Sequence, residues 1–184
     1  MTPEELMACT GCTKVATAEA WLPEIELAMN AYDINTTQRR AAFLAQIGHE
    51  SGGLHYTTEI WGPTPTQARY EGREDLGNTQ PGDGSRFRGH GLIQVTGRTN
   101  HAAARDRLQA KFPGMNVPDF ELQPEALAQM RWAALSAADF WAAHGLNELA
   151  DAGDFARITR RINGGLNGEA ERVALYGAAM GVLA

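Results

Sequence analysis

Two glutamates in the first third of the chain are spaced for general acid–base chemistry. Glu50 ends the stretch TQRRAAFLAQIGHE, which begins at Thr37, a residue that can cap a helix, and Glu59 follows Glu50 nine residues later. When two carboxyl groups face each other, one can donate a proton to a leaving group while the other removes a proton from water. The elements around both residues must decide whether they form such a pair.

Glu50 lies on the apolar face of a predicted helix. Phe43, Ile47 and Glu50 share one face at about 3.6 residues per turn, and this face should look into the core. Partial burial and the negative end of the helix dipole both favour a protonated carboxyl group, the form that a general acid needs. The alternative is an ordinary surface glutamate that pairs with Arg39 or Arg40 on another turn.

Glu59 lies near the start of a long irregular region, 54–86, which prolines and glycines interrupt. Loops of this length inside a compact domain are usually functional or mobile. Gly52 and Gly53 can turn the chain after the helix, so that Glu59 can face Glu50 across a cleft. Taken alone, a glutamate in this position is more often a surface residue.

A polar cluster follows within residues 86–104. Gln94 and Thr96 stand among apolar residues in a short segment that we expect to be buried, where polar groups need hydrogen-bond partners. Thr96 and Asn100 are four residues apart where a helix should begin, so both can present polar groups to one side. The same residues also fit a structural role, with Thr96 as a cap and Gln94 and Asn100 stabilising the loop. The glycine spacing does not match a phosphate-binding loop.

The rest of the pattern is helical and predicts a mainly α fold. Helices are expected over about 17–32 and 124–144, the second with the strongest apolar content of the chain. A glycine-rich turn at 163–168 precedes a last helix, in which Arg172 is a cation beside the turn and, taken alone, a surface residue. The apolar residues that this last helix carries are Val173, Leu175, Tyr176, Met180 and Val182.

Composition and charge limit the class of protein. The 184 residues, 43% apolar and 21% charged, suit one compact domain over 1–184, and a net charge of −6 argues against nucleic-acid binding. Between residues 86 and 111, however, six Lys or Arg accompany one acid, Asp106. This segment is either a basic patch that attracts an anionic polymer or a solvated helix face. No stretch approaches the ~20 apolar residues of a membrane span and the N-terminus does not resemble a secretory signal, so we expect a cytoplasmic product without membrane insertion.

The cysteines indicate neither metal nor redox chemistry. Cys9 and Cys12 form a C-x-x-C without a following strand–helix unit or a second ligand pair, so two structural thiols near the first helix are expected. No cluster of His, Cys, Asp and Glu has the spacing of metal ligands. The sequence therefore predicts no metal and no other cofactor.

Three segments together resemble glycoside hydrolase family 19, the chitinase-like family, and within it the short phage-type endolysins. The segments are GHESGG around Glu50, FRGHGLIQVTGRTN at 87–100, and INGGLNG at 162–168, followed by Arg172. They stand in the right order over about 120 residues. The resemblance implies a lysozyme-like α-helical catalytic domain with a long irregular loop region lining the cleft. It also implies cleavage of β-1,4-linked N-acetylhexosamine polymers.

The resemblance also implies roles by position. Glu50 resembles the general acid of the family and Glu59 its general base, while Thr96 falls where a Ser or Thr helps to hold the attacking water. The residues at positions that line the sugar cleft or support the carboxylates are Gln94, Asn100, Asn163 and Arg172. The loop between the two acids is much shorter than in plant chitinases of the family, and Asn167 stands where those enzymes have an acid.

These roles predict a single displacement with inversion, in which Glu50 protonates the glycosidic oxygen and Glu59 deprotonates water. Peptidoglycan glycan strands are the expected substrate, because their negative charge suits the basic segment 86–111 better than uncharged chitin does. We expect a monomer that is made in a bacterial cytoplasm and acts on the cell wall after release. The alternatives are a chitinase that acts on chitin oligomers, a lytic transglycosylase that uses one Glu, and a catalytically silent wall-binding module.

Overall fold

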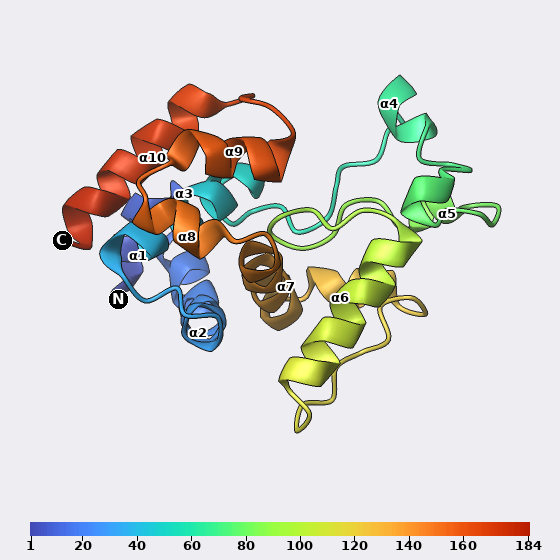
Figure 1. The fold of residues 1–184 in the computed structure, drawn as a ribbon, viewed down its shortest axis with the longest axis horizontal. Coiled ribbons are helices and arrows are strands. Elements are labelled where there is room, and N and C mark those ends of the chain that lie inside the picture. The colour runs from blue at the N-terminus through green and yellow to red at the C-terminus, as the bar shows by residue number, and fades with distance from the viewer. The chain divides into compact units, whose positions relative to one another are not determined.

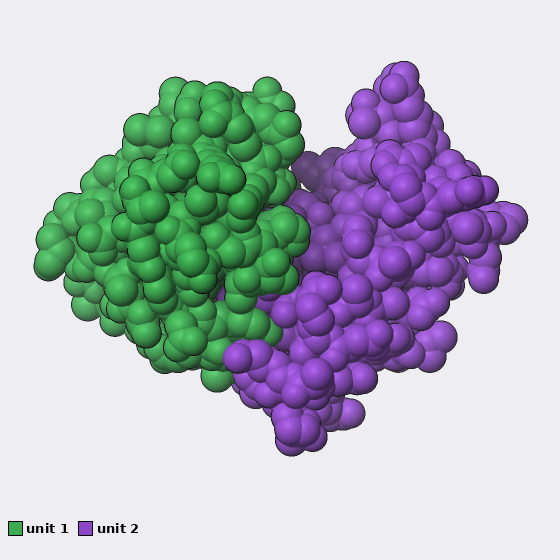
Figure 2. All heavy atoms as spheres, in the orientation of Figure 1, with its two compact units in different colours: residues 1–56, 140–184 green, residues 57–139 purple.

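The protein is almost entirely helical. The computed structural model describes residues 1–184 and contains ten α-helices, two 3-10 helices and only isolated β-bridges (Figure 1). The predicted mainly α fold is confirmed. The chain forms two compact units: unit 1 comprises Met1–Tyr56 and Phe140–Ala184, and unit 2 comprises Thr57–Asp139 (Figure 2). The single domain over 1–184 stays a prediction. None of the helices combines the length and the apolar character that a membrane span requires.

Unit 1 contains six complete helices, and one of them, α3, contacts three of the others. The six helices are α1 (Pro3–Thr10), α2 (Val15–Ala31), α3 (Thr37–Glu50), α8 (Leu146–Asp151), α9 (Phe155–Asn163) and α10 (Glu169–Val182). α3 contacts α1, α8 and α10 (Figure 1), and its residues 41–48 are all buried. Gly48 permits the contact with α1, because a Cβ at this position would lie 2.4 Å from the carbonyl oxygen of Thr10. α3 therefore runs through the core of unit 1 and delivers Glu50 at its end.

The cap of α3 differs from the prediction by one residue. The Thr36 hydroxyl accepts a hydrogen bond from the N–H of Arg39 at 3.2 Å, so Thr36 is the N-cap. Thr37 is already helical, and its hydroxyl donates to the carbonyl of Leu183 at 3.1 Å. Two adjacent threonines made the position of the cap ambiguous in the sequence.

The apolar residues of α10 do not all reach the core. Val173 is 49% exposed and Val182 is 40% exposed. The buried face of α10 instead carries Arg172 and Ala179, which are seven residues, or about two turns, apart. Because this is the face that packs against the neighbouring helices, Arg172 points inward and is not a surface residue.

The long helix predicted over 124–144 is divided. Its first part is the 3-10 helix η2 (Pro124–Ala128), and the α-helix proper is α7 (Met130–Ala143). Gln129 between them has an extended backbone, with ψ at 141°, which breaks the helical hydrogen-bond pattern. The single continuous helix predicted over 124–144 was therefore wrong, because the apolar pattern gave no sign of the break at Gln129.

Unit 2 combines short helices with loops. Besides η2 and the first part of α7, it contains α4 (Pro65–Ala68), η1 (Glu74–Leu76), α5 (Asp83–Arg86) and α6 (Arg98–Lys111). Three of these lie within 54–86, so that region is less irregular than predicted. Two isolated bridges, Thr58 with His90 and His90 with Val95, join three loop segments side by side.

The basic segment 86–111 is not a free positive patch. Three of its arginines are neutralised within unit 2, and the pairs are Arg98 with Asp83 and Glu121, Arg105 with Asp106 and Asp119, and Arg107 with Asp139. Arg86 donates to the carbonyls of Glu121 and Leu122. The interpretation as a basic patch was therefore wrong, because most of the neutralising acids lie outside the segment in which charges were counted.

Both cysteines are buried free thiols, as expected for structural residues. Burial raises the pKa of Cys9 to about 11, so this thiol stays protonated and poorly reactive. No group of three or more His, Cys, Asp or Glu residues is placed to hold a metal ion.

Candidate active site

Glu50 is the last residue of α3, and its side chain is 19% exposed. Arg172 reaches it from α10, where Nη2 donates to Glu50 Oε1 at 2.5 Å, and no protein group binds Oε2. The Arg172 side chain is only 2% exposed. Glu50 is thus partly buried, as its helix face predicts. Its cation is Arg172, whereas Arg39 binds Asp151.

Arg172 alters the electrostatics that the sequence suggested for Glu50. The sequence indicated two influences, partial burial and the negative end of α3, and the structure adds a positive charge in direct contact. This charge opposes both. A carboxyl group that gives up its proton beside a guanidinium leaves a stabilised anion. Arg172 therefore suits a carboxyl group on which negative charge develops during a reaction.

The Arg172 guanidinium binds three different partners. Besides the bond to Glu50, Nη1 donates to Gln46 Oε1 at 2.5 Å and Nε donates to the carbonyl of Asn167 at 3.3 Å. The same carbonyl accepts from Asn163 Nδ2 at 3.2 Å. The structure thus brings Glu50, Asn163 and Arg172 together. Asn167 contributes its main-chain carbonyl, so this contact does not require an acidic side chain at the position where plant chitinases have one.

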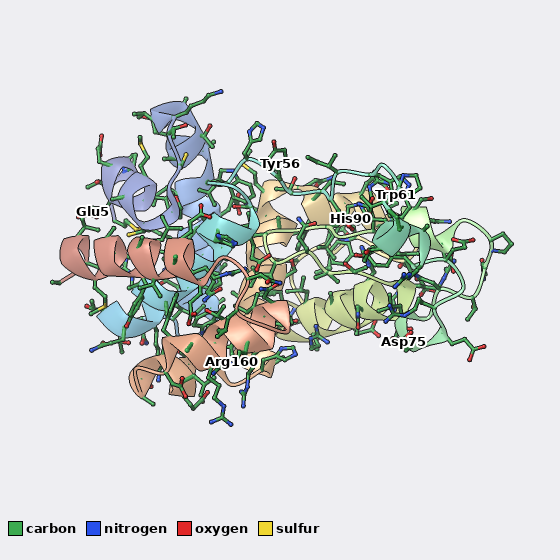
Figure 3. All side chains as sticks on the ribbon, turned by 90° about the horizontal axis from the view of Figure 1, so that it is seen from above. Glu5, Tyr56, Trp61, Asp75, His90 and Arg160 are labelled. Atoms are coloured by element: carbon green, nitrogen blue, oxygen red, sulfur yellow. The ribbon has the colours of Figure 1, made fainter.

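Removing the Arg172 charge should destabilise unit 1. We expect Arg172→Met to lower the free energy of unfolding by about 3 kcal/mol, because breaking a buried pair leaves Glu50 and Gln46 without their donor. Urea unfolding monitored by circular dichroism measures this loss. The matched control is Arg160→Met on α9, where the arginine is exposed (Figure 3), and this change should stay within about 0.5 kcal/mol. Equal effects of the two variants would contradict the expectation.

Glu59, in unit 2, is held by three hydrogen-bond donors. Oε1 accepts from Nε2 of Gln67 at 3.0 Å and from the hydroxyl of Tyr70 at 3.4 Å, and Oε2 accepts from the N–H of Gly89 at 3.0 Å. The N–H of Glu59 in turn donates to the carbonyl of Gly89 at 2.8 Å. Burial, together with the nearby Glu59 carboxylate, raises the pKa of Tyr70, so its hydroxyl remains a donor.

The predicted polar residues of segment 86–104 are joined to one another. Gln94, at φ 53°, donates from Nε2 to the carbonyl of Gly91 at 3.0 Å, while a Cβ on Gly89 would lie 2.4 Å from Gln94 Oε1. The Thr96 hydroxyl donates to the carbonyl of Gln94 at 3.1 Å, and Asn100 Nδ2 donates to the carbonyl of Thr96 at 2.8 Å. These bonds stabilise the loop, as the structural alternative for Gln94 and Asn100 predicted. The prediction of Thr96 as a cap was wrong, because the N-cap of α6 is Gly97 and no side chain caps this helix. The roles of these residues toward sugar and water stay predictions.

Two buried histidines support the same loop of unit 2. His90 lies among the loop segments (Figure 3), with Nδ1 3.0 Å from Nε2 of His101, while Nδ1 of His101 lies 2.9 Å from the carbonyl of Gly97. Since a carbonyl only accepts, His101 carries its proton on Nδ1 and accepts from His90. The pKa of each ring is lowered to about 4, by burial in both cases and, for His90, also by the proximity of His101. Both rings are therefore neutral near pH 7.

This pair predicts a loss of stability in mild acid. The unfolded chain binds these two protons near pH 6.5 and the folded chain only near pH 4, so protonation favours unfolding. The stability from the neutral pair is fully present above pH 6.5. It should fall by about 1.4 kcal/mol per pH unit and ring as the pH drops toward 4. Urea unfolding at a series of pH values measures the slope. His90→Gln, which keeps a donor toward His101, should roughly halve it, and an unchanged slope would exclude the pair as its origin.

Comparison with known proteins identifies the family. The chain is 36% identical over 170 residues to a glycosyl hydrolase family 19 domain-containing protein of Haemophilus influenzae, covering 77% of this chain and 78% of that protein. The chain belongs to glycosyl hydrolase family 19. It is a glycosidase, and the resemblance to the chitinase-like family 19 is confirmed.

Further relatives of this family 19 chain are chitinases. It is 33% identical over 125 residues to an endochitinase of Arabidopsis thaliana, covering 68% of this chain and 39% of that protein. Chitinase C from Streptomyces griseus superposes with a TM-score of 0.70 at 20% identity, covering 99% of this chain and 76% of that one. A mutant of chitinase C gives 0.68 at 19% identity. These structures confirm the chitinase-like, lysozyme-like α-helical fold. No family model matches the chain.

Sequence reasoning missed several residues that hold the two glutamates of this family 19 enzyme. Gln46 lies four residues before Glu50 on the same helix, a spacing that could have indicated it. Gln67 is part of a capping box with Thr64, which was also readable, but nothing local shows that its Nε2 turns toward Glu59. Tyr70 had no signal in the sequence.

Proposed function

We propose that this glycosidase hydrolyses β-1,4 bonds of an N-acetylhexosamine polymer in a single displacement with inversion. Glu50 protonates the glycosidic oxygen, Glu59 deprotonates a water molecule on the opposite face of the sugar, and Thr96 helps to position that water. The observation that carries the proposal is the unequal bonding of the two carboxyl groups. Glu50 keeps Oε2 unbound beside one cation, whereas both oxygens of Glu59 accept hydrogen bonds.

The partners of Glu50 fit a proton donor. Negative charge grows on its carboxyl group as the proton leaves, and the Arg172 guanidinium on Oε1 stabilises that charge. Oε2 remains available to carry the proton to the glycosidic oxygen. An interaction that strengthens as the reaction proceeds lowers the barrier, whereas one that is equally strong throughout does not.

The partners of Glu59 fit a proton acceptor. The donors from Gly89, Gln67 and Tyr70 bind both oxygens of the carboxyl group and fix its orientation. The Thr96 hydroxyl donates its hydrogen to the carbonyl of Gln94. A free lone pair on the hydroxyl oxygen can therefore accept a hydrogen bond from water. A water molecule bound in this way would direct its second hydrogen toward a base.

We further propose peptidoglycan as the natural polymer, with the chain acting as an endolysin-type lysozyme on the cell wall. Supporting this are the sequence resemblance to phage-type endolysins and the match to a bacterial family 19 protein over most of that protein's length. The charge argument no longer contributes, because the basic segment is paired. Chitin is the second candidate, favoured by that pairing and by the chitinases among the similar proteins.

Side-by-side digestion tests the reaction and the substrate together. Purified cell walls and chitin oligomers are incubated with the enzyme, new reducing ends are counted, and products are identified by mass spectrometry. Release of reducing ends from cell walls at a rate at least tenfold higher than from chitin supports peptidoglycan as the substrate. Activity on chitin alone would make chitin the first candidate. Nuclear magnetic resonance of the first anomer formed shows inversion or retention. Anhydro ends would indicate a lytic transglycosylase, and binding without cleavage a silent module.

A further inference from the structure

We infer that Gln46 is a positioning residue for the reaction, because its amide holds Arg172 so that the guanidinium binds one oxygen of Glu50 and leaves the other free. The inference rests on the proposed role of Glu50 as the general acid. It is carried by a chain of hydrogen bonds that runs from α9 through α3 to α10, all within unit 1.

The hydrogen bonds have a single consistent direction. The Thr159 hydroxyl donates to the carbonyl of Phe155 at 3.2 Å, so its oxygen accepts from Nε2 of Gln46 at 2.9 Å. The amide oxygen of Gln46 then faces Nη1 of Arg172, which can only donate. A flipped amide would set an NH₂ group against the guanidinium. Thr159 therefore determines which end of the Gln46 amide Arg172 meets.

The burial of these groups makes the arrangement hard to replace. Gln46 and Thr159 are 0% exposed and Arg172 is 2% exposed. Bulk water cannot substitute for a lost partner at such positions. Because the guanidinium is planar, holding Nη1 also orients Nη2, the nitrogen that binds Glu50.

The neutrality of Gln46 is part of the inference. A carboxylate at position 46 would share Arg172 with Glu50, which lies four residues later on the same helix. A second negative charge nearby disfavours loss of the proton from the first carboxyl group. A neutral amide accepts from Arg172 without this competition.

The other titratable groups near the end of α3 are the same in every variant tested. α10 also brings Glu171, whose Oε2 lies 3.0 Å from His49 Nδ1. α1 brings Cys9, which burial keeps protonated, with its pKa raised to about 11. α8 brings Asp151, which binds Arg39 near the other end of α3. The arginines of α9 are exposed, and they are Arg157, Arg160 and Arg161.

The variant Gln46→Glu keeps the shape of the side chain and adds the charge. The alkaline limb of the kcat–pH profile should move to higher pH by about one unit, with KM changed less than about twofold. Gln38→Glu is the matched control, since it adds the same charge at an exposed position of α3 about 18 Å from Glu50 along the helix. That separation exceeds the Debye length of ~8 Å, so the limb should stay in place. A limb that does not move, or moves equally in both variants, overturns the inference.

A second pair of variants is available if Gln46→Glu does not fold. Thr159→Val removes the hydroxyl that orients the amide and should lower kcat about tenfold with KM unchanged. Thr159→Ser restores the hydroxyl and should recover activity to within about twofold. Both are assayed at a temperature where circular dichroism shows the folded state. Equal kcat values for the two variants contradict the positioning role, whatever their melting temperatures.

Glu50→Gln separates this inference from the proposed function. If Glu50→Gln keeps most of the activity, the proposed function fails. If it is inactive while the variants at Gln46 and Thr159 match the wild type in kcat and pH profile, only the positioning role fails.

Discussion

Glu50→Gln should lower kcat by about 10³-fold while the protein remains folded. General acid catalysis contributes about 10² to 10⁴ in rate, and an amide cannot donate a proton of the required acidity. The fold should persist, because the amide oxygen of Gln can still accept from Arg172 Nη2. Release of reducing ends from the preferred polymer measures kcat, and circular dichroism checks the fold.

Two comparisons make this result specific. Glu19→Gln changes an exposed glutamate of α2 in the same unit and should leave kcat within about twofold. A substrate whose leaving group needs no protonation, such as an activated aryl glycoside, should recover much of the lost rate with Glu50→Gln. Residual activity above about a tenth of the wild-type value on the natural polymer would reassign the general acid.

Glu59→Gln should lower kcat by about 10²-fold or more and should also remove the acidic limb of the pH profile. A general base works only when deprotonated, so its loss leaves residual activity that no longer falls as the base is protonated. Some destabilisation accompanies the change, on the order of 1 kcal/mol, because an amide has one acceptor oxygen for the three donors that now bind Glu59. The pH profile of kcat/KM separates the chemical effect from this structural one.

The control for Glu59 lies in the same unit. Glu125 is an exposed glutamate of η2, and Glu125→Gln should leave both rate and profile unchanged. An acidic limb that persists in Glu59→Gln would assign the base to another residue. A loss of kcat matched by an equal loss of folded protein would remove the evidence for a chemical role.

Local patterns predicted the helices and the candidate glutamates because both depend on short-range spacing. The face of α3 that carries Phe43, Ile47 and Glu50 follows directly from the helical period, and the structure places Glu50 at the edge of the core. Arg172 was different. It lies 122 residues after Glu50, so the local pattern around it gave no sign that it is buried against a carboxylate. Only the resemblance to the family suggested a role for it.

The basic segment shows a second limit of linear reasoning. Counting charges along 86–111 gave an apparent excess of cations, but Arg98 binds Asp83, fifteen residues earlier, and Arg107 binds Asp139, thirty-two residues later. Charge in a folded protein is balanced between residues that are close in space, whatever their separation in sequence. A patch inferred from sequence therefore needs the acids on the neighbouring elements before it supports a choice of substrate.

Gly89 has a consequence for how relatives of this protein can vary. Its N–H and its carbonyl both bind Glu59, while Gln94 Oε1 fills the space that a Cβ on Gly89 would need, at 2.4 Å. Positions 89 and 94 should therefore covary in evolution. Homologues with a side chain at position 89 should carry a residue shorter than Gln at position 94, and an alignment in which the two positions change independently would argue against this coupling.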